Sequence, residues 1–299
     1  MGHTPTWAWI VLAAVVALIL GTDLWGWRGG RVRSRRAALV WALVCIVVGL
    51  AFGAFVWVTF GSRLAQEYYA AYSMEEGLSL DNLLLFYVVF RSFRVPRALQ
   101  HKVLFWGVLG ASVFRGIFIF LGVAAIERWV WVSYLFSAVL LYAAWSAFRQ
   151  DPARKDGSRV VEWLSRRLPL TSEAEGGEFI ARDRNGRWAA TPLLAALIVI
   201  ELADVVFALD SVPAVLSVTR NRFVVYGSNV FAILGLRALY TLLAATITWL
   251  RYLHYGLAAV LAFAALKILG ERWVDVPPLA SIGIVAALVG GAVWASLKS

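Results

Sequence analysis

Three carboxylates interrupt the strongly apolar stretch VIELADVVFALDSVP, residues 199–213. They belong to Glu201, Asp204 and Asp210. A charge at the centre of a bilayer costs about 2.5–3.5 kcal/mol on insertion scales, so such residues usually face a polar interior and serve an ion or proton path. Carboxylate oxygens are the ligands that hard divalent cations prefer. The stretch therefore predicts one half of a cation site inside a membrane.

A second acid-bearing stretch, MEEGLSLDNLLLF at residues 74–86, repeats this spacing. Its acids Glu75 and Asp81 are six residues apart, as are Asp204 and Asp210. A small polar residue follows the second acid in each stretch. We expect the two stretches to meet, with Asp81 facing Asp210, and to supply oxygen ligands to one cation. The expected ligands are Glu75, Asp81, Asn82, Glu201, Asp204, Asp210 and Ser211.

Compensating positive charge within the apolar segments is scarce. Three supporting basic residues fall there, Arg115, Arg237 and Lys267, against six acids in the two stretches when Glu76 is included. Salt bridges inside the bundle are the competing explanation, and they absorb about half of the acids. The surplus points to an exogenous cation or to protons. Because both stretches lack cysteine and histidine, Mn²⁺, Mg²⁺ or Ca²⁺ suits the site better than Zn²⁺ or Cu⁺. We expect the cation as a substrate, with no resident cofactor.

The composition is that of a protein that crosses a membrane several times. Of 299 residues, 61% are hydrophobic and 15% are charged, whereas soluble domains carry about 25% charged residues. Long apolar segments without period-two alternation favour helices over a barrel. We predict an all-α polytopic bundle of about nine transmembrane helices. They cover residues 6–26, 37–60, 72–90, 103–126, 129–148, 188–218, 223–250, 253–270 and 276–297.

Basic residues in the loops set the expected orientation, because cytoplasmic loops carry an excess of Lys and Arg. Loops on one side hold 20 of these residues, nine of them in loop 149–187, and loops on the other side hold five. The net charge of +10 therefore reflects topology rather than nucleic-acid binding. We expect an integral plasma (inner) membrane protein with its N-terminus outside and its C-terminus in the cytoplasm. The expected partners are the lipid bilayer and a divalent cation, a homo-oligomer stays open, and enzymatic activity is not expected.

Two groups of three predicted helices resemble each other. The segment FWGVLGASVFRGIF (105–118) parallels SNVFAILGLRALY (228–240), with Arg115 and Arg237 each three residues before an aromatic residue. Since the two groups run in opposite directions across the membrane, we predict an inverted three-plus-three repeat, a plan typical of secondary transporters. The expected parts are two N-terminal helices (1–71), repeat unit one (72–148), a cytoplasmic loop (149–187), repeat unit two (188–270) and a C-terminal helix (271–299).

Five segments resemble a known family. The motifs EEGLSLDNLLLF, QHKVLFWGVLGASVFRGIFI, ATPLLAALIVIELADVVFALDSVPAV, VVYGSNVFAILGLRALY and YLHYGLAAVLAFAALKILG resemble the TerC family of integral membrane proteins. The resemblance covers about residues 72–270, and EWLSRRLPLT is most similar to the pH-responsive branch. It implies nine helices, an outside N-terminus, and Mn²⁺ export that protects ion homeostasis under metal excess or alkaline pH. It also implies that Glu75, Asp81, Glu201, Asp204 and Asp210 matter.

Two departures from the family pattern bear on affinity and coupling. The turn TRNRF (219–223) replaces an acidic or proline-containing turn, and Glu76 stands where a basic residue is common. Two other functions stay open beside divalent cation export. One is a membrane scaffold, or a tellurite-type stress-resistance component without transport, in which the acids pair internally. The other is an intramembrane aspartyl enzyme, which the missing GxGD element disfavours.

Overall fold

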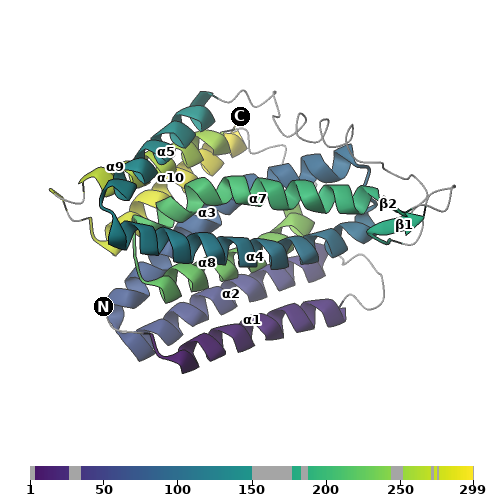
Figure 1. Ribbon diagram of the computed structural model, residues 1–299, viewed down its shortest axis with the longest axis horizontal. Coiled ribbons are helices and arrows are strands. Elements are labelled where there is room, and N and C mark those ends of the chain that lie inside the picture. The colour runs from purple at the N-terminus through teal and green to yellow at the C-terminus, as the bar shows by residue number, and fades with distance from the viewer. Residues whose placement is uncertain are drawn as a thin grey trace.

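The fold is almost entirely helical (Figure 1). The computed structural model describes residues 4–26, 35–149, 177–182, 188–243, 252–270, 273–274 and 276–298. The helices are α1 (Thr6–Gly26), α2 (Arg35–Phe60), α3 (Ser62–Ser92), α4 (Arg97–Arg128), α5 (Trp131–Arg149), α7 (Pro192–Leu216), α8 (Arg222–Leu243), α9 (Leu253–Gly270) and α10 (Pro278–Lys298). Antiparallel strands β1 (Ile180–Arg182) and β2 (Trp188–Ala190) form a small hairpin. The predicted all-α class is confirmed, whereas most of loop 149–187 lies outside the described residues.

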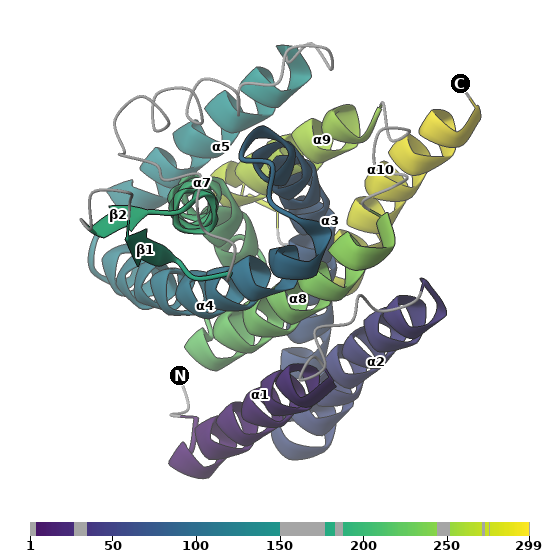
Figure 2. The same cartoon turned by 90° about the vertical axis from the view of Figure 1, so that its right-hand side faces the viewer.

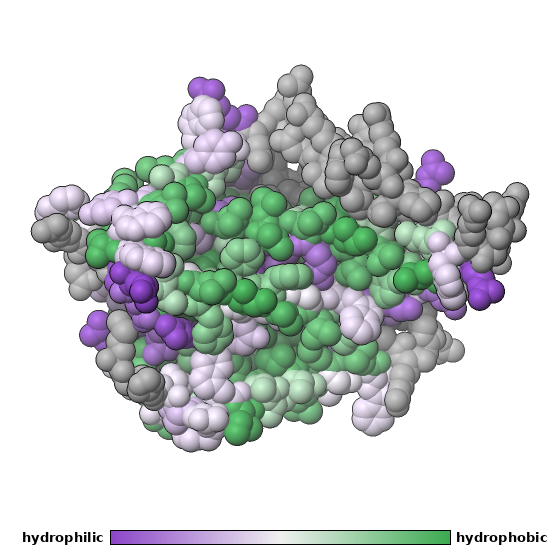
Figure 3. Space-filling model, in the orientation of Figure 1, coloured by the Kyte–Doolittle hydropathy of each residue, from purple (hydrophilic) through white to green (hydrophobic). Residues whose placement is uncertain are grey.

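Six of the described helices are long and apolar enough to cross a membrane, judged by length and composition. They are α1, α2, α4, α5, α7 and α10. The qualifying parts of α8 and α9 are shorter, and α3, which carries the acid-bearing stretch 74–86, is not among the six. Figure 3 shows hydrophobic residues over the middle of one face and hydrophilic residues mainly near the two ends of the helices. This surface is typical of a helix bundle in a bilayer.

Helix α3 begins earlier than the sequence predicts. The expected start is residue 72, but the helix starts at Ser62. Gly61 makes the turn from α2 with a φ of 92°, a backbone angle that residues other than glycine rarely adopt. Arg63 Nε then lies 3.4 Å from Oε1 of Glu67, one turn along the helix, and the Tyr68 hydroxyl donates to the Gly49 carbonyl at 2.9 Å. The polar residues that suggest a loop are therefore a helical extension that packs on α2.

Helix α7 begins later than the sequence predicts. The expected helix starts at residue 188, but residues 188–190 form β2 and α7 starts at Pro192. Proline suits the first helical position because its missing N–H has no helical partner there. The Thr191 side chain caps the helix by accepting from the Leu194 amide at 3.5 Å. Its hydroxyl also lies 2.8 Å from the Glu178 carbonyl oxygen, so the cap joins α7 to the hairpin.

The two expected groups of three helices pack against each other, and each helix of one group lies along a helix of the other. Helix α3 packs along α8, α4 packs along α7, and α5 packs along α9. Helix α7, seen end-on in Figure 2, contacts α3, α4, α5 and α9. Its remaining face, with Leu202, Val206 and Leu209, is exposed. Helices α1 and α2 lie to one side, where α2 contacts α3 and α8. This arrangement places the acid-bearing helices α3 and α7 in contact with each other.

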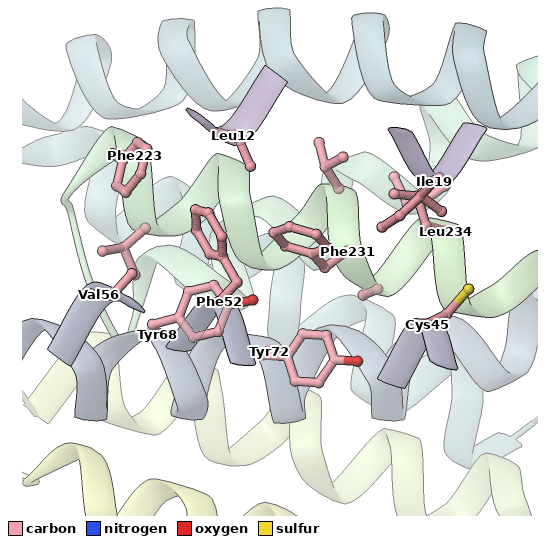
Figure 4. Close-up of a cluster of buried hydrophobic side chains, with 14 of the residues drawn as sticks. Leu12, Ile19, Cys45, Phe52, Val56, Tyr68, Tyr72, Phe223, Phe231 and Leu234 are labelled. Atoms are coloured by element: carbon pink, nitrogen blue, oxygen red, sulfur yellow. The ribbon is translucent and has the colours of Figure 1, made fainter. Parts of the chain in front are cut away.

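An aromatic cluster joins the N-terminal helices to the rest of the bundle (Figure 4). Phe52 of α2 lies at its centre, with ring centroids 4.8 Å from Phe231 and 5.8 Å from Phe223, both of α8. Tyr68 and Tyr72 of α3 stack on each other with centroids 6.0 Å apart. Such rings bury large apolar areas and hold helices in a fixed relative position. The cluster thus fixes α2, α3 and α8 as one packed unit beside the acid-bearing region.

Helices α9 and α10 pack closely at Gly256. A Cβ added at Gly256 would lie 2.6 Å from the Ala292 Cβ and 3.1 Å from the Leu288 carbonyl oxygen. Small residues permit such close helix packing in membranes. We expect Gly256→Leu to lower the unfolding free energy by about 1–3 kcal/mol through overpacking, measured by thermal denaturation in detergent. The matched control is Gly290→Leu on α10, where nothing lies within 4 Å of an added Cβ. Equal melting temperatures for the two variants would contradict this prediction.

Candidate functional site

Arg115 occupies the centre of the bundle. It projects from α4 and its side chain is only 1% exposed. Its Nη1 lies 2.9 Å from Oε2 of Glu75 on α3. On its other side, Nη2 lies 2.9 Å and Nε 3.2 Å from Oδ1 of Asp204 on α7. One guanidinium therefore bridges the two acid-bearing helices, as a buried charge requires partners.

A fourth helix completes this contact network. Asn229 of α8 is fully buried, and its Nδ2 donates to Oε1 of Glu75 at 2.7 Å. Both Glu75 oxygens thus accept from donors on different helices, Arg115 on α4 and Asn229 on α8. Asp204 accepts from Arg115 alone among the hydrogen bonds of the described part of the chain. Glu75 is held by two independent groups, and Asp204 is held by the fork of one guanidinium.

A cavity of about 310 Å³ opens beside this network. Helices α3, α4, α5, α7 and α9 line it. Its polar lining side chains are Glu75, Ser79, Asn82, Arg115, Tyr142, Ser146, Asp210 and Ser211. Four predicted ligands, Glu75, Asn82, Asp210 and Ser211, therefore meet at one cavity, whereas Asp204 lies behind Arg115 and does not line it.

Two buried hydroxyls in the cavity wall lack partners. Ser79 and Ser211 are each 2% exposed, and their Oγ atoms have no hydrogen-bond partner among the described residues. A buried polar group without a partner costs free energy, so native proteins usually satisfy it with protein, water or a ligand. The two hydroxyls come from the opposing helices α3 and α7. They are available to hydrogen-bond a polar molecule in the cavity, water included.

Glu201 lies apart from this cavity. It is half-buried on α7 and faces the surface of α4 at Gly110, where an added Cβ would overlap its carboxylate. Its Oε2 has no hydrogen-bond partner within the part of the chain that is described. Glu201 and Asp204 are three residues apart on α7, and both side chains turn towards α4. Glu201 itself is absent from the cavity lining.

The contact between Glu201 and Gly110 predicts that a larger residue at position 110 moves the Glu201 carboxylate. We expect Gly110→Ala to displace the Glu201 carboxylate while the helices keep their spacing, because the colliding atoms end a flexible side chain. Any activity that uses Glu201 should then fall to the level of Glu201→Gln, with thermal stability close to wild type. Gly107→Ala is the matched control, because an added Cβ there meets only methyl groups, of Ile200 at 3.3 Å and of Leu197 at 3.9 Å. Equal activity of both glycine variants would argue against a role for Glu201.

Three further predicted site residues, Asp81, Arg237 and Lys267, are not among the described residues that line the cavity. The side chains of Asp81 and Arg237 lie outside the described part of the structure, so the expected meeting of Asp81 with Asp210 stays a prediction. Lys267 of α9 donates to the Ser281 hydroxyl of α10 at 2.8 Å, and it does not line the cavity. Among the side chains described, no three His, Cys, Asp or Glu residues are arranged to hold a metal ion.

Comparison with known proteins gives the family. The model of the integral membrane protein TerC family matches residues 60–298, which include every residue of the network and the cavity. The chain belongs to the TerC family. The resemblance expected from the motifs is thereby confirmed, and this TerC family member is an integral membrane protein.

Relatives match almost the whole length of this TerC family member. An "Uncharacterized membrane protein STKORF319" of Myxococcus xanthus is 37% identical over 99% of this chain and 93% of its own. A "Putative membrane-bound redox modulator Alx" of Escherichia coli (strain K12) is 38% identical over 94% of this chain and 91% of its own. The "Uncharacterized membrane protein RC1219" of Rickettsia conorii is 32% identical over 97% of both chains. No solved structure matches the chain.

Sequence reasoning missed four polar residues of this site. Ser79 lies one helical turn after Glu75, so the i, i+4 spacing could have found it. Asn229 falls inside the segment that parallels the Arg115 region, but its amide is uncharged and therefore does not stand out in an apolar segment. Tyr142 and Ser146 come from α5, which carries no acid, so only the packing of α5 reveals them.

Proposed function

We propose that this TerC family protein carries divalent cations, with Mn²⁺ as the first choice, across the membrane through the cavity beside Arg115. The charge at the cavity carries this proposal. Glu75, Asp204 and Asp210 bring three negative charges when ionised, and Arg115 brings one positive charge to the same network. The net charge of two negatives would be balanced by one divalent cation. Charges in a membrane interior require such compensation.

The donor set supports a hard cation as the substrate. The cavity offers carboxylate oxygens of Glu75 and Asp210, the hydroxyls of Ser79 and Ser211, and the amide of Asn82. Oxygen ligands of this kind suit Mn²⁺, Mg²⁺ and Ca²⁺. The cation is the cargo in this proposal, so the protein acts as a carrier with no resident cofactor, not as an enzyme.

The depth of the site supports passage across the bilayer. Asp204 lies at the midpoint of α7 (Pro192–Leu216), one of the helices long and apolar enough to span a membrane. Helix α3 of the first unit packs on α8 of the second, and α7 of the second packs on α4 of the first. Two related three-helix units around a shared twofold axis would give these matching pairs. We therefore propose nine transmembrane helices with an inverted repeat that rocks around the cavity. The excess of basic loop residues supports an outside N-terminus in the inner membrane.

A flux assay tests the proposed function. The purified protein is placed in liposomes that contain a Mn²⁺-sensitive dye, and Mn²⁺ is added outside with and without a pH gradient. Saturable Mn²⁺ entry above that of protein-free liposomes supports the proposal, and competition by Mg²⁺, Ca²⁺ or Zn²⁺ ranks the substrates. Folded protein that gives no flux with any of these ions under either condition contradicts it.

A membrane scaffold without transport is the second candidate. The pairing of Glu75 and Asp204 with Arg115 favours it, because these two acids already have an internal partner. Under this reading, replacing Glu75 or Asp204 lowers the folded yield, and the wild-type protein shows no flux. The same liposome assay therefore separates the two candidates.

A further inference from the structure

The contacts of Arg115 are unequal on its two sides. Nε and Nη2 both approach the Asp204 carboxylate, at 2.9–3.2 Å. Nη1 alone reaches Glu75, at 2.9 Å. Two nitrogens in one planar fork match a carboxylate and hold it more firmly than a single contact does. Arg115 is therefore anchored on Asp204 and makes a more easily broken contact with Glu75.

The two acids also differ in their access to the cavity. Glu75 and Asp210 line the cavity, whereas Asp204 does not. Glu75 keeps a second partner if Arg115 withdraws, because Asn229 holds its Oε1 at 2.7 Å. The carboxylate could thus turn from the guanidinium to a guest in the cavity without losing its position on α3.

An ion and Arg115 would compete for the same oxygen. A divalent cation bound to Oε2 of Glu75 at about 2.2 Å would lie within about 5 Å of Nη1, which itself sits 2.9 Å from that oxygen. Two cations at that distance in a poorly screened interior repel each other strongly. Retreat of the guanidinium onto Asp204 leaves two neutral groups, Arg115 with Asp204 and the ion with Glu75 and Asp210.

We propose that Arg115 is a built-in competitor of the transported ion, which pairs with Glu75 in the empty site and releases it on ion binding while Asp204 remains its anchor. This inference rests on the proposed function. It gives two different roles to residues in and beside the cavity. Glu75, Asp210, Ser79 and Ser211 contact the ion, and Asp204 positions Arg115 without contacting the ion.

The decisive variant removes both members of the anchored pair. Arg115→Gln with Asp204→Asn keeps the net charge of the network and a polar side chain at both positions, and it frees Glu75 from competition. We expect this double variant to bind Mn²⁺ at least about tenfold more tightly than wild type, in equilibrium titrations of detergent-purified protein. The control, Arg222→Gln with Glu127→Gln, removes an ion pair of 2.7 Å whose side chains are 42% and 37% exposed, and should bind as wild type does.

The outcomes separate this inference from the proposed function. Wild type that binds Mn²⁺, with a double variant that binds equally or more weakly, overturns the competitor role and restores Asp204 as a ligand. Absence of Mn²⁺ binding to every folded protein overturns the proposed function itself. Tighter binding together with slower flux in liposomes is the expected pattern, because an ion without its competitor leaves the site slowly.

A measurement on the wild-type protein covers the case in which the double variant does not fold. Phenylglyoxal labels accessible guanidinium groups, and peptide mass spectrometry resolves each arginine. We expect saturating Mn²⁺ to lower the labelling of Arg115, since the guanidinium withdraws from the cavity onto Asp204, and to leave Arg222 unchanged. Unchanged or higher labelling of Arg115 with Mn²⁺ present would show that the guanidinium does not withdraw, and the proposal would be wrong.

Discussion

Asp210→Asn should abolish saturable Mn²⁺ flux, with a loss of at least about 100-fold, while the protein stays folded. Asp210 lines the cavity opposite Glu75, and it comes from the helix turn that also carries the unpartnered hydroxyl of Ser211. The substitution keeps the shape of the side chain and removes one of the two negative charges that we assign to the ion. A divalent cation would then bind with an uncompensated positive charge in the membrane interior, which is strongly unfavourable.

The size of this effect is best judged against two other variants. Asp210→Glu keeps the charge and should recover part of the flux, because a carboxylate can still reach the cavity. Glu127→Gln removes an acid from an exposed ion pair at the end of α4 and should leave the flux unchanged. The measurement is initial Mn²⁺ flux in liposomes at matched protein content, with circular dichroism and gel filtration as checks of folding. Retention of more than about half of the flux in Asp210→Asn would remove this residue from the transport path.

The sequence predicts the chemistry of the site better than its geometry. The spacing of Glu201, Asp204 and Asp210 along one helix determines which helix face each acid occupies. It does not determine which neighbouring helix that face meets. Helix α4 packs along α7, so its Arg115 captures Asp204 and its Gly110 receives Glu201. Two acids expected to bind an ion thus contact α4 instead.

The same limit explains the residues that only the structure reveals. Asn229 approaches Glu75 because α8 packs along α3, although 154 residues separate them in the chain. Tyr142 and Ser146 reach the cavity because α5 lies against α7 and α9. A charge in an apolar segment is visible in the sequence, whereas a neutral hydrogen-bonding residue in such a segment is not. The early start of α3 has a related reason: polar residues such as Arg63 and Glu67 are typical of a loop in the sequence, whereas the structure pairs them one turn apart on a helix.

Asp204→Asn is expected to destabilise the fold by about 3–5 kcal/mol, the usual cost of leaving one member of a buried ion pair uncompensated. Arg115 is 1% exposed and keeps its charge under all ordinary conditions. Without Asp204 it would depend on the single contact from Nη1 to Glu75. It should then hold Glu75 more tightly, so the variant should also bind Mn²⁺ more weakly even though Asp204 does not line the cavity.

The stability of this variant is measured by thermal denaturation in detergent beside Glu127→Gln and the double variant Arg115→Gln with Asp204→Asn. The exposed pair of Glu127 and Arg222 should contribute at most about 1 kcal/mol. The double variant should regain part of the stability that Asp204→Asn loses, because it buries no uncompensated guanidinium, although Glu75 then keeps only the neutral Asn229 as a partner. This reversal separates an anchoring role from simple loss of packing, since both variants carry the same asparagine. If the double variant is as unstable as Asp204→Asn, the loss comes from other contacts of Asp204, and Arg115 does not depend on it as an anchor.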